Sequence, residues 1–209
     1  YKDPGRDNGK IPKPFRDIYR SDLGELLTTY YFEEKVGIEE RYIIPIKNIS
    51  TRERYDMPGK GIDSIGYRID NNGKVTLLLA EAKVSGEKNN PPSVVDKTTD
   101  SLYKTQKKYH DNPQTVEQRL TEYIKGLAGK DLRIILSVII NIENGNTEHF
   151  DITYGCGLVR DYTCVDENKD FGKMRSCESE FLPGNVHFVI FSFSESTIES
   201  TIEQFYNKV

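Results

Sequence analysis

The chain has 209 residues, of which 36% are hydrophobic and 30% are charged, and its formal net charge is −4. This length and composition predict one soluble, globular domain over residues 1–209, large enough to bury a core. No apolar run approaches the roughly 18 residues that a membrane-spanning helix needs. The small negative charge does not itself indicate nucleic-acid binding, although local basic patches rather than totals decide such binding.

The predicted elements are those of an α/β domain with a mixed central β-sheet flanked by helices. The first helix begins at a Ser21 or Asp22 cap and ends at Gly37. The elements after it are, in chain order, a strand at 41–46, a long polar loop at 47–60, strands at 62–69 and 74–84, helices at 95–110 and 116–127, and a strand at 132–142.

The C-terminal third follows a core at about 17–142. Residues 143–185 are rich in Gly and Asn and have weak periodicity, so they are predicted to form an irregular insert. A buried strand at 186–193 and an amphipathic helix at 196–207 complete a final segment at 186–208. The three cysteines at 156, 164 and 177 are odd in number and widely spaced. This spacing argues against a disulfide framework or a zinc site, and a reducing cytoplasm is expected.

The hairpin of the two central strands decides which side chains share a face. Residues 71–73 (Asn-Asn-Gly) suit a three-residue loop with glycine in the left-handed conformation, which pairs Asp70 with Lys74. Counting outward from this pair, the opposed residues are Ile69 and Val75, Tyr67 and Leu77, Ile65 and Leu79, and Asp63 and Glu81. Strand alternation places Lys83 on the same face as Glu81.

Two opposed carboxylates and an amine therefore continue an apolar face. Asp63 and Glu81 repel each other unless a cation lies between them, and a hard divalent ion with oxygen ligands removes that repulsion. Lys83 adds a positive charge that can orient water or stabilise developing negative charge. Hydrolysis of a phosphodiester bond requires such a set. The alternative is a pair of solvated carboxylates with a Glu81–Lys83 surface ion pair, and a one-residue shift of register would separate Asp63 from Glu81.

The spacing of these residues resembles a known motif. Asp63, followed eighteen residues later by Glu81-Ala82-Lys83 at the end of an apolar strand, resembles the PD-(D/E)XK nuclease superfamily. Residues 22–27 (DLGELL), 61–63 (GID) and 79–83 (LAEAK) resemble more narrowly the HamA-like nuclease subunit of the Hachiman anti-phage defence system. The likeness covers about residues 15–142 with the last strand and helix. It departs at Ile62, where the motif has proline. It also departs after Gln106, because recombination-type relatives have a tyrosine four residues after a glutamine, whereas this chain has His110 at that position.

The resemblance implies a restriction-endonuclease-like core with the element order αβββαβ. It implies a Mg²⁺- or Mn²⁺-dependent deoxyribonuclease in which Asp63, Glu81 and the Ala82 carbonyl bind the ion and Lys83 is the catalytic lysine. Glu25 would be an auxiliary metal ligand from the first helix, although a glutamate in an early helical turn is also a favourable partner of the helix dipole. The resemblance further implies a DNA substrate, a helicase partner subunit and no membrane.

Basic residues outside the motif are candidates for contact with the nucleic-acid backbone. Lys97, Lys104 and Lys108 share a predicted helical face, and Arg52 and Arg54 lie in the long loop. Ordinary solvated charge is the alternative for both sets. The rival function is a catalytically silent nuclease-like module that binds nucleic acid or a helicase partner. Stabilisation of the fold by Mg²⁺ or Mn²⁺ would favour the enzyme.

Overall fold

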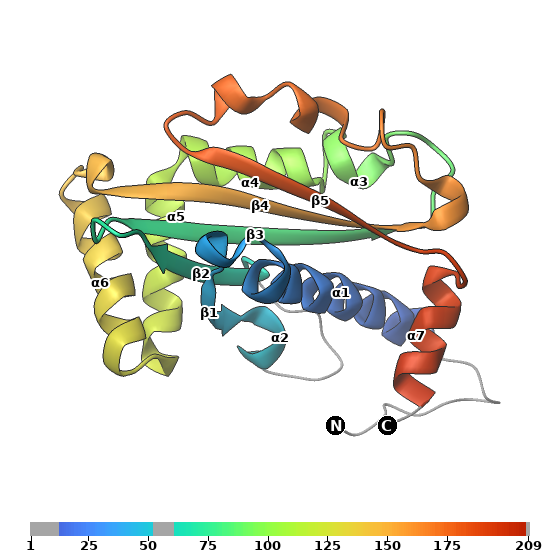
Figure 1. Cartoon of the computed structure of the whole chain (residues 1–209), viewed down its shortest axis with the longest axis horizontal. Coiled ribbons are helices and arrows are strands. Elements are labelled where there is room, and N and C mark those ends of the chain that lie inside the picture. Colours follow the sequence, from blue (N-terminus) through green and yellow to red (C-terminus); the bar gives the residue numbers. More distant parts are fainter. Residues whose placement is uncertain (1–12, 52–60, 208–209) are drawn as a thin grey trace.

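The computed structural model describes residues 13–51 and 61–207, with side chains for 16–50 and 61–204. They form a mixed five-stranded sheet with helices on both faces, which confirms the α/β class (Figure 1). The strands are β1 (Ile43–Lys47), β2 (Ser64–Ile69), β3 (Val75–Ser85), β4 (Phe150–Asp161) and β5 (Asn185–Phe193). The α-helices are α1 (Lys13–Tyr30), α2 (Asn48–Thr51), α3 (Ser93–Asp96), α4 (Leu102–Asp111), α5 (Pro113–Tyr123), α6 (Gly129–Glu143) and α7 (Ile198–Asn207).

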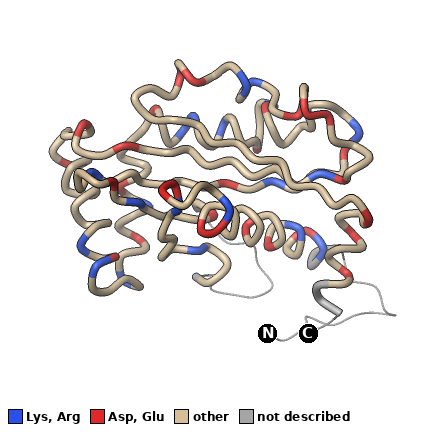
Figure 2. The backbone as a smooth tube through the Cα atoms, in the orientation of Figure 1, with Lys and Arg blue, Asp and Glu red and all other residues tan. Residues whose placement is uncertain are grey.

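Shorter helical turns connect these elements. A π-helical turn, Tyr31–Lys35, extends α1. The 3-10 turns are Ile38–Glu40, Ile124–Gly126, Thr147–His149, Tyr162–Cys164, Gly172–Arg175 and Glu178–Glu180. Charged residues of both signs are interspersed over the part of the molecule that the structure describes, in keeping with the small net charge (Figure 2).

The sheet has the order β1-β2-β3-β4-β5. The first three strands are antiparallel neighbours, whereas β3, β4 and β5 run parallel. The crossover from β3 to β4 carries α3, α4, α5 and α6, because parallel neighbours cannot be joined by a tight turn. Strand β3 therefore lies in the middle of the sheet, between its antiparallel and parallel halves.

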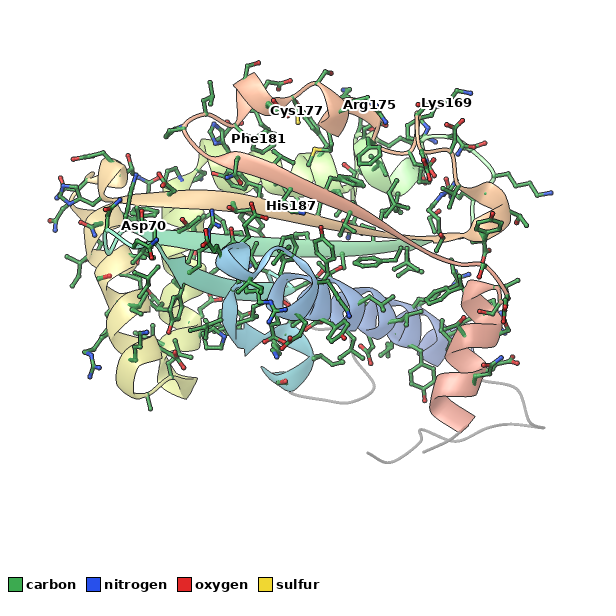
Figure 3. All side chains as sticks on the ribbon, in the orientation of Figure 1. Asp70, Lys169, Arg175, Cys177, Phe181 and His187 are labelled. Carbon is green, nitrogen blue, oxygen red and sulfur yellow. The ribbon has the colours of Figure 1, made fainter. Side chains whose placement is uncertain are left out.

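The predicted hairpin register is confirmed. Ile69, Tyr67 and Ile65 pair with Val75, Leu77 and Leu79, respectively. The loop is closed by a hydrogen bond from the Asp70 N–H to the Lys74 carbonyl at 3.0 Å, and Gly73 has φ +84°. A positive φ at this position is what the three-residue loop demands of its last residue. Asp70 marks this end of the sheet, far from α7 (Figure 3).

Alternation along β3 sends successive side chains into two different cores. Leu77 and Leu79 pack with residues of α4, α5 and α6, whereas Leu78 and Ala80 pack with Phe32 after the end of α1. Helix α1 runs across β3 and β4 on this second face, and α7 packs beside α1 (Figure 1). Glu81 and Lys83 continue the row of Leu77 and Leu79 and so belong to the face that α4 covers.

The predicted irregular insert is wrong in its first part, because residues 150–161 form the buried central strand β4. Its glycines suggested a loop, but they are packing sites. A Cβ atom added to Gly157 would lie 1.8 Å from the Thr28 Oγ1 atom, and one added to Gly155 would lie 2.9 Å from the Phe32 ring. Glycine within a strand often marks such a close approach. Here it lets α1 and its extension lie directly on the sheet.

The predicted strand at 132–142 is also wrong, because these residues belong to helix α6. The apolar run resembles a strand buried on both faces, yet its polar residues Arg133, Ser137 and Asn141 recur every four positions. Arg133 and Ser137 are exposed, while Ile135, Val138 and Ile139 are buried. A four-residue spacing of polar positions is the solvent face of an amphipathic helix.

Three smaller corrections concern element boundaries. Helix α1 begins at Lys13 rather than at Ser21 or Asp22, because Pro14 lies in its first turn, where a helix does not need the missing N–H. The predicted helix at 95–110 is two helices, α3 and α4, and α4 has Ser101 as its N-cap. Strand β5 is half-buried rather than buried, because it is an edge strand of the sheet. Among the helices of the described residues, none has the length and apolar character to cross a bilayer.

Candidate active site at the edge of strand β3

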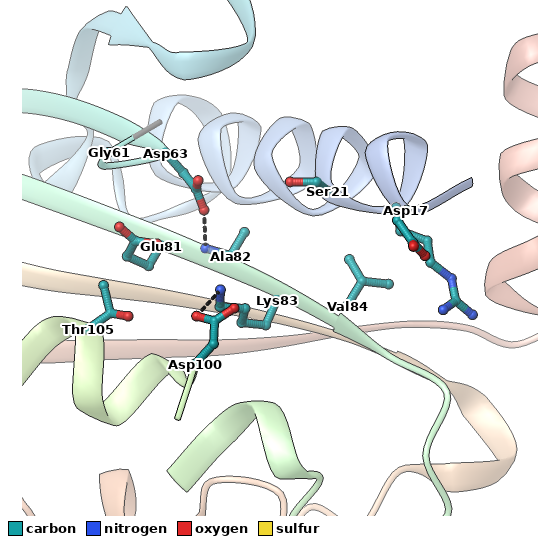
Figure 4. A pocket seen from close by; sticks show the side chains of 11 residues that line it. Asp17, Ser21, Gly61, Asp63, Glu81, Ala82, Lys83, Val84, Asp100 and Thr105 are labelled. Carbon is teal, nitrogen blue, oxygen red and sulfur yellow. Dashed lines mark hydrogen bonds and ion pairs between the residues drawn. The ribbon is translucent and has the colours of Figure 1, made fainter. Parts of the chain in front are cut away.

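The site lies where β3 extends beyond the end of β2. The pairing of β2 with β3 ends at Ser64 and Ala80, whereas β3 continues to Ser85. A pocket of about 450 Å³ lies along this edge, and helix α1 and the N-terminal end of α4 border it (Figure 4). Its lining residues are Asp17, Arg20, Ser21, Gly61, Asp63, Glu81, Ala82, Lys83, Val84, Asp100 and Thr105.

Asp63 takes the place of the next residue of β2. Its Oδ2 atom accepts a hydrogen bond from the Ala82 N–H at 2.8 Å, where a longer β2 would have offered a backbone carbonyl. The N–H and C=O of one strand residue point to the same side of the strand. The Ala82 carbonyl therefore faces the same edge as the Asp63 carboxylate.

Glu81 lies beside Asp63 at the end of the apolar row and is only 4% exposed. Burial raises the pKa of Asp63 to about 6, against the lowering effects of the Ala82 N–H and of Lys83. Burial and then the charge of Asp63 raise the pKa of Glu81 well above its usual value. The Tyr109 hydroxyl donates to Glu81 Oε1 at 3.4 Å. The pair thus resists carrying two negative charges in the absence of a further cation.

Lys83 lies on the same face, and its amine forms a hydrogen bond with a third carboxylate, that of Asp100. Its Nζ atom donates to Asp100 Oδ1 at 2.8 Å, and the side chains of Lys83 and Asp100 are 21% and 79% exposed. Burial lowers the pKa of Lys83, but the hydrogen bond to Asp100 and the surrounding carboxylates outweigh it and raise the pKa. The amine is therefore a fixed positive charge at the mouth of the pocket.

The structure does not place Glu25 among the described residues that line the pocket. Glu25 is 2% exposed, and its Oε1 atom accepts a hydrogen bond from the Ile49 N–H at 2.5 Å. This contact joins α1 to the start of α2. The role of Glu25 as an auxiliary metal ligand remains a prediction.

The predicted basic stripe is wrong in part, because Lys97 does not share a helix with Lys104 and Lys108. Lys97 follows the end of α3, and the Lys104 amine donates to the Thr98 carbonyl at 2.5 Å. Lys108 is exposed on α4. The structure places none of the three in the pocket lining, and Arg52 and Arg54 lie outside the described residues.

The sequence patterns did not predict several residues of the pocket. Asp100 directly precedes Ser101, which is the N-cap of α4. A serine N-cap is a local signal, and it would have placed Asp100 at the start of α4, where it accepts a hydrogen bond from Lys83. Asp17, Arg20 and Ser21 reach the pocket because α1 begins earlier than predicted and crosses β3. No local pattern in the sequence indicates that crossing.

The arrangement offers oxygen ligands and a cation in one cleft. Within the described residues, no group of three His, Cys, Asp or Glu side chains is arranged to hold a metal ion. Beside one another at the edge of β3 are the carboxylates of Asp63 and Glu81 and the Ala82 carbonyl, while Asp17 and Asp100 add two further carboxylates to the pocket lining. Mg²⁺ commonly binds one or two carboxylates and keeps several waters. Such a set is therefore adequate for a partly hydrated ion.

Comparison with known proteins identifies a family for the chain. A family model described as HamA matches residues 7–209 and so includes every residue of the pocket. No curated protein and no solved structure matches the chain significantly. The match supports the resemblance to the Hachiman subunit, and with it a role in anti-phage defence. The chain belongs to the HamA family.

Proposed function

We propose that the chain is a divalent-metal-dependent nuclease that hydrolyses phosphodiester bonds of DNA and acts as the effector of a prokaryotic anti-phage defence system. The observation that supports this best is the placement of Asp63, Glu81 and Lys83 together in one pocket. Burying two adjacent carboxylates destabilises a fold because their charges lose contact with water and repel each other. A module without a metal-dependent activity would have no need of such a destabilising pair.

The carboxylate pair fits a divalent ion. Asp63 and Glu81 carry raised pKa values because they are buried together, and the nearest amine is bonded to Asp100. We propose that Asp63, Glu81 and the Ala82 carbonyl hold Mg²⁺ or Mn²⁺. A bound ion of this kind polarises a phosphate and lowers the pKa of a bound water.

Lys83 is proposed to act on the reacting phosphate itself. Its raised pKa keeps the amine protonated, so it supplies positive charge where negative charge develops on the phosphoryl oxygens. The bond to Asp100 is exposed, and exposed ion pairs are worth roughly 0–1 kcal/mol. A phosphate entering the pocket can therefore replace Asp100 as the partner of Lys83.

Membership of the PD-(D/E)XK superfamily is part of the same proposal. The order α1, β1, β2, β3, α4 and β4 supports it, because this is the αβββαβ core expected of that superfamily. A helicase partner subunit is proposed from the family alone. Lys97, at the end of α3, and Lys104 and Lys108, on α4, remain candidates for contacts with DNA outside the pocket.

The proposal is tested with the purified chain, alone and with any partner subunit it requires. Supercoiled plasmid, linear duplex and single-stranded DNA are incubated with Mg²⁺, with Mn²⁺ or with EDTA. Cleavage that depends on the metal and disappears in EDTA is expected, and the three substrates distinguish internal from terminal cutting. Binding of DNA without cleavage under all conditions would favour the silent module instead.

A further inference from the structure

One arginine of α1 borders the pocket and has unused hydrogen-bonding capacity. Arg20 of α1 is one of the residues that line the pocket. Its terminal NH2 group pairs with Glu199 of α7, but its buried Nε–H has no hydrogen-bond partner among the described residues. Buried donors are nearly always satisfied, so an unsatisfied one calls for a missing acceptor. A guanidinium with a free N–H at the rim of a pocket is suited to an anion.

Arg16 provides an internal comparison. It lies one helical turn before Arg20 and pairs through its Nε atom with the same Glu199 carboxylate at 3.3 Å. Arg16 is not among the described residues that line the pocket. The two arginines thus share a helix and an acidic partner, and differ in whether they reach the pocket.

The surroundings decide what kind of anion fits. Ser21, next to Arg20, is exposed on the pocket wall and offers a hydroxyl donor (Figure 4). The carboxylates of Asp17, Asp63, Glu81 and Asp100 also line the pocket and repel anions, so a divalent ion at Asp63 and Glu81 would favour the entry of a phosphate. Within the part of the chain that the structure describes, Lys83 and Arg20 are the basic side chains that line the pocket. They come from β3 and α1, respectively, so one strand that lies in the pocket along the edge of β3 can offer a phosphate to each.

We infer that Arg20, with the Ser21 hydroxyl beside it, binds a backbone phosphate of the nucleic-acid strand next to the phosphodiester that reacts at Lys83. This inference rests on the proposed function for the class of substrate. It assigns the contact to α1 rather than to the lysines of α4. Glu199 holds the arginine in place before the strand arrives, and the phosphate becomes its second acceptor.

The test compares Arg20→Ala with the matched control Arg16→Ala in nucleic-acid binding. Fluorescence anisotropy of labelled single-stranded and duplex DNA is measured over a range of salt concentrations, with Ca²⁺ in place of Mg²⁺ and again in EDTA. Arg20→Ala should weaken binding about tenfold, since bonds to charged groups are worth that much or more. It should also reduce the salt slope by about 0.7–0.9, the value for one phosphate contact. Arg16→Ala should stay within about twofold of the wild type.

Equal effects of the two substitutions, or a wild type that binds neither DNA, would overturn the inference. Should Arg20→Ala fail to fold, judged by circular dichroism, Arg20→Lys provides the second variant, with Arg16→Lys as its control. Lysine keeps the positive charge and can pair with Glu199, but it lacks the planar set of guanidinium N–H groups, so Arg20→Lys should bind DNA more weakly than Arg16→Lys. Equal binding by the two lysine variants would contradict the inference.

This readout separates the inference from the proposed function. If the wild type never cuts DNA, but Arg20→Ala weakens DNA binding and Arg16→Ala does not, the phosphate site is supported and the nuclease proposal is contradicted. If the wild type cuts DNA with metal, but Arg20→Ala binds DNA like the wild type, the nuclease proposal is supported and the phosphate site is contradicted.

Discussion

The carboxylate pair predicts that Asp63→Asn stabilises the metal-free protein above neutral pH. The substitution keeps the size of the side chain, and the amide oxygen can still accept the Ala82 N–H bond. It removes a negative charge that burial beside Glu81 makes unfavourable, as the raised pKa values of both groups show. We therefore expect ionised Asp63 to lower the stability of the metal-free fold, as residues selected for function often do.

The magnitude follows from the pKa of Asp63. The value rises from 3.8 to about 6, a change of about two units, and each unit corresponds to about 1.4 kcal/mol. The ionised form thus costs the fold up to about 3 kcal/mol, and solvent at the pocket mouth reduces this to about 1–3 kcal/mol. For a chain of this size, the gain in Asp63→Asn corresponds to a rise in Tm of roughly 2–10 °C.

The sign of the pH dependence is fixed by which state binds more protons. Between about pH 4 and 6 the folded protein holds the Asp63 proton more tightly than the unfolded chain does. The stabilisation of the protonated form is thus complete below pH 4 and is lost as the pH rises through 6. The difference in stability between Asp63→Asn and the wild type should grow over this range and then level off.

The assay is chemical unfolding in EDTA at a series of pH values from 4 to 8. The free energy of unfolding of Asp63→Asn should be closest to that of the wild type at pH 4 and should exceed it at pH 8. In a second series at pH 8, with Mg²⁺ in place of EDTA, the ion should raise the stability of the wild type but not that of the variant. A variant less stable than the wild type at pH 8 would refute the reasoning, because it would mean that the ionised carboxylate stabilises the fold.

Three further predictions concern the metal and the packing. Glu81→Ala should abolish the rise in Tm that Mg²⁺ or Mn²⁺ causes in the wild type, since few protein ligands remain for a hydrated ion; an undiminished rise would place the ion elsewhere. Gly157→Ala should destabilise by about 1–3 kcal/mol or more in denaturant unfolding, because its Cβ atom would lie 1.8 Å from Thr28 Oγ1; Thr28→Ala should restore part of that loss. Asp170→Ala should cost about 3–5 kcal/mol, because it leaves the fully buried Arg160 without the carboxylate that binds its Nε atom at 3.1 Å; a loss below 1 kcal/mol would contradict this.

The antiparallel half of the fold was predictable because its information is local. The loop at residues 71–73 fixes the register, and the alternation from Ile65 to Leu79 identifies the buried face. That register carried the prediction for Asp63, Glu81 and Lys83 as far as one shared face, and all three line one pocket. The roles of these residues in catalysis and metal binding remain predictions.

The parallel half was not predictable because its patterns depend on distant partners. The glycines of β4 resemble loop residues until Thr28 and Phe32 of the opposing segment are known. Arg20 likewise reaches the pocket because α1 crosses β3, and no local pattern indicates that crossing. Helix α6 and Asp100 are different, because the four-residue spacing of polar residues in α6 and the Ser101 N-cap beside Asp100 are local patterns.

The most direct test of the central claim is nicking of supercoiled plasmid in Mg²⁺ or Mn²⁺ by the wild type, Lys83→Ala and Glu81→Ala, with any activating partner present. We expect the wild type to cut and both variants to lose cutting. Lys83→Ala should still be stabilised by the metal, because lysine supplies charge rather than ligation, whereas Glu81→Ala should not. A wild type that cuts, with both variants cutting at the same rate, would show that Asp63, Glu81 and Lys83 are not the active site.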